Sequence, residues 1–261
     1  MSDSFVLDAV RRLAAAGVEN PRLDARLLLA HADGDRVCFE SLISRRAARE
    51  PLATITGRKE FWSLDFEVGP GVLIPRPETE TVIEQALAFF PDRSALLRAL
   101  DLGTGTACLL VAFLKEFPNT RGLGIDRSEE ARAYAVRNVA RHGLERRCEI
   151  RGGNWAEAVD GPYDVILSNP PYIKTMDLAG LEPEVAYEPV SALDGGPDGL
   201  SAYRALAPAL ARLLGPSGRA FIEIGAGQAG EISAVLAQSG LDVIKVAPDL
   251  AGIPRVLIIG R

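Results

Sequence analysis

Residues 168–173, with the sequence SNPPYI, follow the apolar run YDVIL and bring together groups that can hold a planar nitrogen. Two adjacent prolines have no N–H to donate, so they end a strand and keep the chain rigid. The side-chain oxygen of Asn169 and the carbonyl oxygen of Pro170 then form two fixed acceptors, which suit the two donors of a planar –NH₂ group. Tyr172 offers an aromatic face for a flat amide or base, or else packs at the strand end. We predict that Asn169, Pro170 and Tyr172 act in catalysis and that Pro171 joins them in contacting the substrate.

A glycine-rich turn earlier in the chain predicts a second binding element. In LDLGTGTACLLVAF, Gly103 and Gly105 let the backbone approach a ligand closely. The N–H groups that open the following helix can bind an anion. The turn lacks the GxGxxG pattern, which makes a dinucleotide less favoured as its ligand. We predict that the loop binds a cofactor through Gly103, Thr104, Gly105, Thr106, Ala107 and Cys108.

Two acids and a tryptophan complete the predicted cofactor site. Asp126 ends the next strand, where an acid can accept both hydroxyls of a ribose; it can also cap the helix SEEARAYAV, and the two roles are compatible. Asp101 is a candidate for binding the amino group of the ligand's amino-acid part. Trp155, in the loop GGNWAEA, either flanks an adenine ring or packs in the core. A ligand with adenine, ribose and a zwitterionic tail fits these positions, and S-adenosylmethionine has these three parts. Asn169 would also contact this cofactor. Its product would be S-adenosylhomocysteine.

The elements that position these residues alternate between strand and helix from about residue 76. This rhythm predicts an α/β fold with a mostly parallel sheet and helices on both faces. The last two strands are separated only by DLAGIP, too short for a parallel crossover, so they should be antiparallel neighbours. We therefore predict a seven-stranded Rossmann-like sheet whose last strand is antiparallel. The predicted strands are RALDLG, RGLGID, RRCEIRG, YDVILSN, GRAFIEIG, LDVIKVAP and RVLIIGR.

The chain before this sheet predicts two further parts. Residues 1–56 have helical spacing: a first helix stops at Gly17, and a second starts with Asn20 as its cap and Pro21 in its first turn. Residues 57–75 predict a connecting β-hairpin, in which KEFWSLDFEV alternates, GPG turns and VLIP forms the second strand. Residues 76–261 then form the catalytic domain.

Composition excludes several classes of protein. The net charge is -6 and the arginines are interspersed with acids, so a general grip on nucleic-acid phosphates is not expected. No apolar run is long enough to cross a membrane, and the start of the chain has no signal-peptide pattern, which predicts a cytoplasmic protein. No CxxC is present, so the three cysteines predict reduced structural thiols, and neither histidine has a ligand-like neighbour, so no metal site is predicted.

Taken in order, the glycine loop, the acidic strand end and NPPY resemble the class I methyltransferases that alkylate planar nitrogens. That pattern is shared by adenine-N(6) DNA methyltransferases and glutamine-N(5) protein methyltransferases. The stretch TGRKEFWSLDFEVGPGVLIPRPETE resembles the HemK-type methyltransferases of peptide chain release factors, and PRPETE, residues 75–80, is its most specific part. The similarity also covers EPVSALDGGPDGL, EIGAGQ and DLAGIPRVLIIGR, and so extends from about residue 51 to the end.

This resemblance implies a substrate and partners. The substrate would be the glutamine in the Gly-Gly-Gln loop of class-1 peptide chain release factors, and the N-terminal helices would help to dock the factor. The enzyme would be a cytoplasmic monomer without direct DNA binding or membrane attachment. The chain departs from the family at Ala107, usually glycine, at Asn154, often an acid, and at Thr54, often tyrosine.

Three alternatives stay open at this point. Ribosomal-protein glutamine methyltransferases resemble the chain in outline but usually lack the hexapeptide PRPETE. A DNA adenine methyltransferase would need to flip a base and to carry a basic recognition region, which an acidic chain with a small helical N-terminal part does not offer. A noncatalytic nucleotide-binding or scaffold protein would have no need of the intact NPPY segment.

Overall fold

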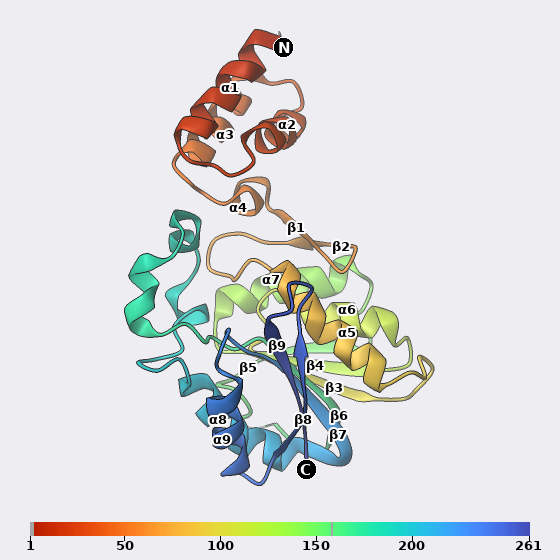
Figure 1. Ribbon diagram of the computed structural model, residues 1–261. Coiled ribbons are helices and arrows are strands. Elements are labelled where there is room, and N and C mark those ends of the chain that lie inside the picture. Colours follow the sequence, from red (N-terminus) through yellow and green to blue (C-terminus); the bar gives the residue numbers. More distant parts are fainter. Residues whose placement is uncertain (1–2, 158) are drawn as a thin grey trace.

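The computed structural model describes residues 3–157 and 159–261. Residues 1 and 2 of the predicted first helix and residue 158 of the predicted third loop lie outside the described residues. At the N-terminus, four helices form a small bundle that stands apart from the sheet (Figure 1). They are α1 (Asp3–Ala15), α2 (Pro21–His31), α3 (Arg36–Ala47) and α4 (Leu52–Thr56).

The bundle has its own apolar core, because each helix turns one apolar face inward. Its fully buried side chains include Leu13, Leu28, Phe39 and Ile43. Asn20 occupies the N-cap position of α2 and Pro21 opens the helix, as predicted. The Asn20 side chain makes no capping hydrogen bond, so its predicted role as a side-chain cap is wrong. The fixed φ of Pro21 starts this helix without a side-chain acceptor.

A two-stranded hairpin follows the bundle, but its turn is not where the sequence placed it. Strand β1 (Arg58–Phe61) pairs with β2 (Leu64–Glu67), and Trp62 and Ser63 make the turn at φ +53° and +55°. The predicted turn at GPG and the predicted strand VLIP are therefore wrong. Non-glycine residues rarely take positive φ, and here contacts from distant residues hold them.

Hydrogen bonds from the catalytic domain hold this hairpin turn in place. The backbone N–H of Trp62 donates to Glu80 Oε1 at 2.7 Å, and its indole Nε1–H donates to Glu116 Oε1 at 2.8 Å. Within the hairpin itself, the N–H of Ser63 donates to Glu60 Oε1 of β1 at 2.7 Å. These bonds offset the backbone strain, so a residue pair with weak turn preference can end the hairpin.

The catalytic domain contains a seven-stranded sheet in the order β5-β4-β3-β6-β7-β9-β8. The pairs from β5 to β7 are parallel, whereas β9 runs antiparallel to both β7 and β8. The predicted fold class and the antiparallel last strand are thus confirmed. The strands are β3 (Arg98–Leu102), β4 (Arg121–Asp126), β5 (Cys148–Gly152), β6 (Tyr163–Ser168), β7 (Leu214–Glu223), β8 (Asp242–Pro248) and β9 (Pro254–Gly260).

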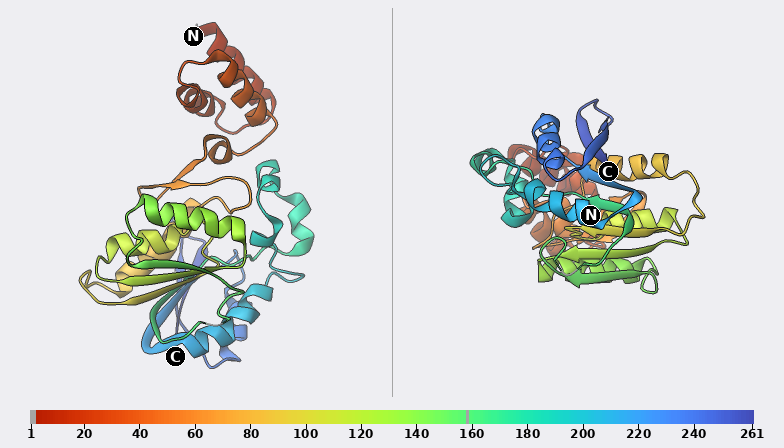
Figure 2. Two further views of the ribbon diagram at one scale, coloured as in Figure 1. Left: turned by 180° about the vertical axis from the view of Figure 1, so that it is seen from behind. Right: turned by 90° about the horizontal axis from the view of Figure 1, so that it is seen from below.

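Helices cover both faces of the sheet, as Figure 2 shows from behind and from below. One face carries α5 (Glu80–Phe89), α6 (Cys108–Glu116) and α7 (Glu129–Arg141), and their apolar side chains form one core cluster with the sheet. The other face carries α8 (Ser201–Leu213) and α9 (Ala229–Ala237), with a second cluster. No helix among the described residues is both long and apolar enough to span a membrane.

A long connection between β6 and α8 joins the catalytic domain to the bundle. It contains the short helices η2 (Thr175–Gly180), η3 (Pro183–Tyr187) and η4 (Val190–Ala192), and a further one, η1 (Pro77–Thr79), precedes α5. Glu184 in η3 accepts hydrogen bonds from Arg46 and Arg49 at 2.5–2.9 Å. The hydroxyl of Tyr187 donates to the carbonyl of Ala48 at 2.8 Å. The segment that follows NPPY is therefore tied to the end of α3.

Candidate active site

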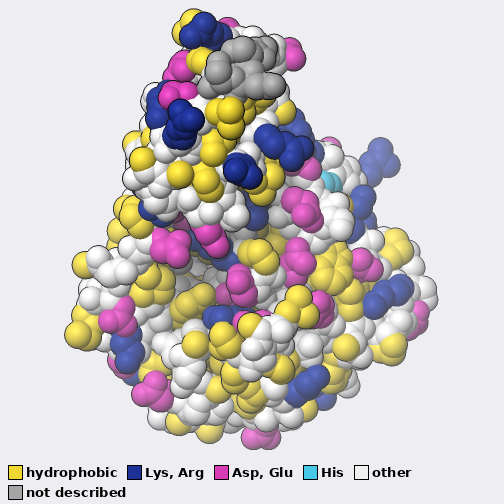
Figure 3. Space-filling view, turned by 45° about the horizontal axis from the view of Figure 1, so that its top comes forward, with side chains coloured by type: hydrophobic (Ala, Val, Ile, Leu, Met, Phe, Trp, Pro, Cys, Tyr) yellow, Lys and Arg dark blue, Asp and Glu magenta, His cyan; other side chains and the backbone are white. Residues whose placement is uncertain are grey.

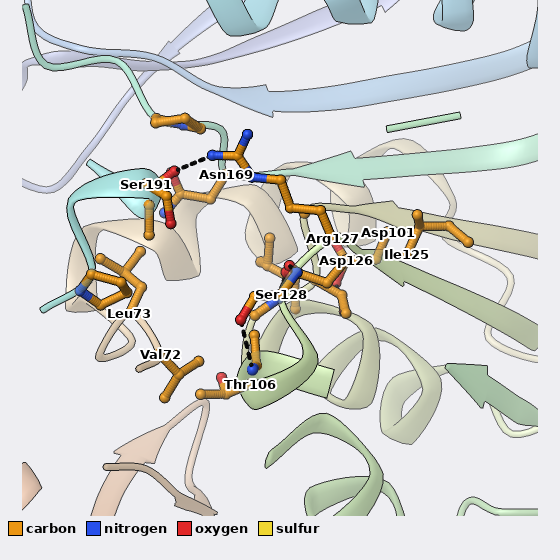
Figure 4. A pocket seen from close by; sticks show the side chains of 18 of the residues that line it. Val72, Leu73, Asp101, Thr106, Ile125, Asp126, Arg127, Ser128, Asn169 and Ser191 are labelled. Carbon is orange, nitrogen blue, oxygen red and sulfur yellow. Dashed lines mark hydrogen bonds between the residues drawn. The ribbon is translucent and has the colours of Figure 1, made fainter. Parts of the chain in front are cut away.

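A pocket lies at the carboxyl edge of the sheet, where β3, β4 and β6 end. In the order β4-β3-β6 the chain continues from β3 to β4 on one side and later returns from β5 to β6 on the other side of β3; open α/β sheets bind ligands at such a switch point. The pocket has a volume of about 980 Å³, including the part open to solvent, and Figure 4 shows it lined by Asp101, Thr106, Asp126 and Asn169. The glycine loop, the acidic strand end and NPPY thus contribute to one site.

The glycine loop adopts a conformation that only its glycines accept easily. Gly103 and Gly105 have φ of +75° and +55°, and Ala107 has φ +63° at the start of α6. The loop is fixed to the neighbouring strand, because the N–H groups of Gly103 and Thr104 both donate to the carbonyl of Ile125. All of the predicted loop residues except Ala107 line the pocket, namely Gly103, Thr104, Gly105, Thr106 and Cys108.

Asp126 ties two of the predicted elements together. Its Oδ2 accepts from the N–H of Gly105 at 2.9 Å, and its Oδ1 accepts from the N–H of Ser128 at 2.9 Å. The cap of α7 is Ser128, whose hydroxyl oxygen accepts from the N–H of Ala131, so the predicted capping role of Asp126 is wrong. Each carboxylate oxygen keeps a further lone pair, which leaves Asp126 able to accept from ligand hydroxyls.

Asp101 is a buried acid with an unused acceptor. Only 1% of the residue is exposed, Oδ2 accepts from the Thr104 hydroxyl at 2.6 Å, and Oδ1 has no partner among the described residues. Burial raises the pKa of Asp101 to about 7, and the nearby charge of Asp126 adds to this shift. A buried, unpaired carboxylate oxygen in a pocket wall is a place for a positively charged donor from a ligand.

Trp155 and Cys108 complete the inner wall of the pocket. Trp155 has φ +53°, lies against Gly103 and packs against the second core cluster. The predicted packing role is therefore confirmed, and Trp155 also lines the pocket. Asn154 also lines the pocket, but it is exposed and its amide donates to Glu157 at 3.3 Å. Burial raises the pKa of the Cys108 thiol to about 12, which keeps it neutral.

The NPPY residues do not all reach the pocket. Asn169 and Pro171 line it, whereas Pro170 is buried and Tyr172 lies outside the lining. The Asn169 amide Nδ2 donates to the Thr79 hydroxyl oxygen at 3.1 Å. Tyr172 packs against the second core cluster, and its hydroxyl donates to Glu223 Oε1 at 3.4 Å. Burial raises the pKa of Tyr172 to about 12.

Sequence reasoning missed the residues that cover the pocket. The lining also includes Val72, Leu73, Thr79, Pro189 and Ser191. Figure 4 shows the Arg127 side chain reaching to Ser191, whose carbonyl accepts from its guanidinium at 3.2 Å. The available signal was the resemblance itself, because these residues belong to GPGVLIPRPETE and EPVSALDGGPDGL, for which the motifs gave no chemical role.

The pocket residues fit the parts of S-adenosylmethionine. The free Oδ1 of Asp101 suits an ammonium, Asp126 suits ribose hydroxyls, and the Trp155 side chain supplies an apolar wall for a flat ring. The positive φ of Gly103 and Gly105 permits close backbone approach. These assignments rest on chemistry and geometry, and they remain predictions for the individual residues.

The chain is similar to known methyltransferases in sequence and in fold. The sequence profile of the methyltransferase small domain matches residues 86–182. A methyltransferase from Pyrococcus furiosus superposes with a TM-score of 0.57 at 22% identity, covering 84% of this chain and 99% of that one, which shows the same fold. The superposition thus shows the fold, and the profile assigns residues 86–182 to a methyltransferase domain.

Full-length relatives identify the family. The release factor glutamine methyltransferase of Rhodospirillum rubrum is 45% identical over 96% of this chain and 82% of its own length. That of Caulobacter vibrioides is 40% identical over 95% of this chain and 92% of its own length. The chain belongs to the release factor glutamine methyltransferase family, as the resemblance in the sequence predicted.

Proposed function

We propose that the protein transfers a methyl group from S-adenosylmethionine to the side-chain nitrogen of the glutamine in the Gly-Gly-Gln loop of class-1 peptide chain release factors. The observation that carries the proposal is the position of Asn169. It stands at the end of β6, in the wall of the pocket, with its amide Nδ2 already paired to Thr79 and its Oδ1 receiving no hydrogen bond from the described residues. This leaves Oδ1 able to accept a hydrogen bond from an incoming amide.

The cofactor site uses residues from three strand ends. Asp101 would pair with the ammonium of the cofactor, and Asp126 would accept from its ribose hydroxyls. The backbone of the loop from Gly103 to Cys108 would lie close against the cofactor. When bound, the cofactor supplies an electrophilic methyl group. Trp155 and Leu73 contribute apolar walls that exclude water from this part of the pocket.

The substrate amide needs both orientation and activation, because its nitrogen lone pair is delocalised into the carbonyl. Asn169 Oδ1 and the carbonyl oxygen of Pro170 would accept from the two –NH₂ protons, and no hydrogen bond between described residues occupies that carbonyl. Both bonds strengthen as positive charge develops on the nitrogen. The methylated nitrogen is very acidic and releases its proton afterwards, so we assign no side-chain base to the transfer.

A protein substrate also needs a docking surface, and we assign this role to the N-terminal bundle. The net charge is -6, and basic and acidic side chains are interspersed over the face seen in Figure 3. This supports a protein substrate over a nucleic acid, for which a continuous basic surface would be needed. The bundle joins the segment after NPPY through Glu184, so that a docked factor would lie beside the pocket.

Labelled S-adenosylmethionine tests the proposal against its rivals. The protein is incubated separately with a purified class-1 release factor, with total ribosomal protein and with duplex DNA, and transferred label is counted. We expect label in the release factor. Label in ribosomal protein or DNA alone would assign the enzyme to one of the alternative substrate classes and contradict the proposal.

A further inference from the structure

We propose that Gln228 is a positioning residue, whose buried side-chain amide holds the backbone of the NPPY segment, residues 169–172, in the direction that methyl transfer needs. This inference rests on the proposed function, because the acceptors that it positions are Asn169 Oδ1 and the carbonyl oxygen of Pro170. It gives a role to the glutamine of EIGAGQ and to glycines near it, to which the site description assigns no chemistry.

The Gln228 side chain joins three segments of the catalytic domain. Gln228 occupies the N-cap position of α9 and is 7% exposed. Its Nε2 donates to the carbonyl oxygen of Tyr172 at 3.1 Å and to that of Gly199 at 3.5 Å. Its Oε1 accepts from the N–H of Gly225 at 3.0 Å. These bonds tie the end of NPPY to the loop GGPDGL before α8 and to the turn EIGAGQ after β7.

The two ends of the Gln228 amide have opposite tasks, so its partners fix its orientation. A backbone carbonyl only accepts hydrogen bonds and a backbone N–H only donates them. The –NH₂ end must therefore face Tyr172 and Gly199, and the oxygen must face Gly225. No other hydrogen bond from residues 3–157 or 159–261 reaches the Tyr172 carbonyl. Loss of the amide would leave this carbonyl without its one fixed partner.

Two glycines leave room for this contact. A Cβ at Gly199, which has φ +78°, would lie 2.5 Å from both Gln228 Nε2 and the carbonyl oxygen of Tyr172. A Cβ at Gly225 would overlap Gln228 Oε1 and would lie 3.0 Å from the Tyr172 ring. A side chain at either position would therefore displace the amide, which gives a physical reason for a glycine in both GGPDGL and EIGAGQ.

The NPPY segment is stiff enough to carry this support to the substrate acceptors. Its two prolines have fixed φ, so a shift at Tyr172 is poorly absorbed between that residue and Asn169. The chain beyond Tyr172 is also held, because the Ile173 N–H donates to the Leu193 carbonyl at 3.1 Å. Gln228 itself does not line the pocket, so its effect on the reaction passes through NPPY.

The kinetics of Gln228→Met test this role when cofactor and release factor are saturating. Methionine keeps the length of the side chain and removes the amide. We expect kcat to fall about 10–100-fold, because a small misplacement of a reacting group can cost about 10²-fold. KM for the release factor and the affinity for S-adenosylmethionine should be nearly unchanged. Gln238→Met, at an exposed glutamine that ends the same helix, is the control and should keep the full rate. A wild-type kcat in folded Gln228→Met overturns the proposal, even if the variant is less stable.

Gly225→Ala tests the same contact without changing Gln228. The added methyl group would push the amide away from Tyr172, so kcat should again fall about tenfold or more. Gly230→Ala is the matched control, because a Cβ at that position in α9 meets no atom within 4 Å, and it should keep the full rate. Neither glycine has a positive φ, so backbone strain does not enter the comparison. Equal kcat values in folded Gly225→Ala and Gly230→Ala would contradict the proposal.

A spectroscopic test separates the positioning role from the proposed substrate. The chain has five asparagines, so selective nitrogen-15 labelling lets the side-chain signals of Asn169 be followed by NMR without substrate and assigned by their loss in Asn169→Ala. We expect these signals to shift in Gln228→Met and in Gly225→Ala. They should keep their positions in the two control variants. Failure of wild type to methylate any release factor would refute the proposed function alone, whereas unchanged Asn169 signals in Gln228→Met would refute the positioning role.

Discussion

At the scale of single residues, Asp101 links cofactor binding to pH. Its pKa is raised to about 7 by burial, above the ordinary value of 3.8, so the ligand-free protein holds it neutral below that pH. An ammonium pairs well only with the ionised carboxylate. We therefore expect affinity for S-adenosylmethionine to be constant above pH 7 and to fall up to about tenfold per unit below it.

Calorimetry between pH 6 and 8.5 measures this dependence, with Asp101→Asn as the matched variant. The amide has the same shape but no charge, so its affinity should be weak and nearly independent of pH. If Asp101→Asn shows the same slope as wild type, another group causes the pH dependence and the assignment of Asp101 is wrong.

Asn169 carries the second prediction at this scale. Asn169→Ala removes one acceptor for the substrate –NH₂, and we expect single-turnover transfer to fall about 10²–10³-fold, as for other preorganised polar contacts. Asn169→Asp keeps an acceptor but cannot donate to Thr79, so its rate should lie between those of wild type and Asn169→Ala. Cofactor affinity, measured in parallel, should change much less. Full activity in the alanine variant would exclude Asn169 from the mechanism.

At the scale of elements, the start of α6 holds an avoidable strain. Ala107 has φ +63°, in a region that costs an L-residue about 1–2 kcal/mol. Ala107→Gly should raise the free energy of unfolding by about 1 kcal/mol. The gain is smaller than the full strain, because glycine gives the unfolded chain more conformational freedom. Chemical denaturation measures this value. A destabilised Ala107→Gly variant would show that the alanine methyl group makes packing contacts worth more than the strain.

The elements also show which features the sequence could predict. Apolar runs such as YDVILSN marked the strands, and two prolines after one of them fixed its end, since such signals are local. The turn at Trp62 and Ser63 was not predictable, because residues with little turn preference are held there by Glu80 and Glu116 from later in the chain.

The contact between Asn169 and Thr79 was hidden for the same reason. Thr79 lies 90 residues from Asn169 in sequence, and Glu223 meets Tyr172 across 51 residues. No local pattern predicts that these side chains share one buried space. A resemblance to a family marked PRPETE as important, but only the structure shows that its Thr79 accepts a hydrogen bond from Asn169.

At the scale of the whole molecule, the bond between bundle and catalytic domain should matter for the protein substrate alone. Glu184 accepts from both Arg46 and Arg49 and is mostly buried, so Glu184→Ala should loosen the bundle. We expect KM for an intact release factor to rise about tenfold, with kcat and cofactor affinity unchanged. Glu40→Ala, which breaks an exposed pair with Arg12 inside the bundle, is the control and should have little effect. Equal KM values in the two variants would contradict a docking role.

The central claim is that this chain methylates one particular amide nitrogen. Tandem mass spectrometry of a release factor incubated with the enzyme and S-adenosylmethionine tests it most directly. The account predicts a single added methyl group on the side-chain nitrogen of the glutamine in Gly-Gly-Gln, formed far more slowly with Asn169→Ala. A methyl group on any other residue, or an unmodified glutamine in a factor incubated with active, cofactor-bound enzyme, would contradict it.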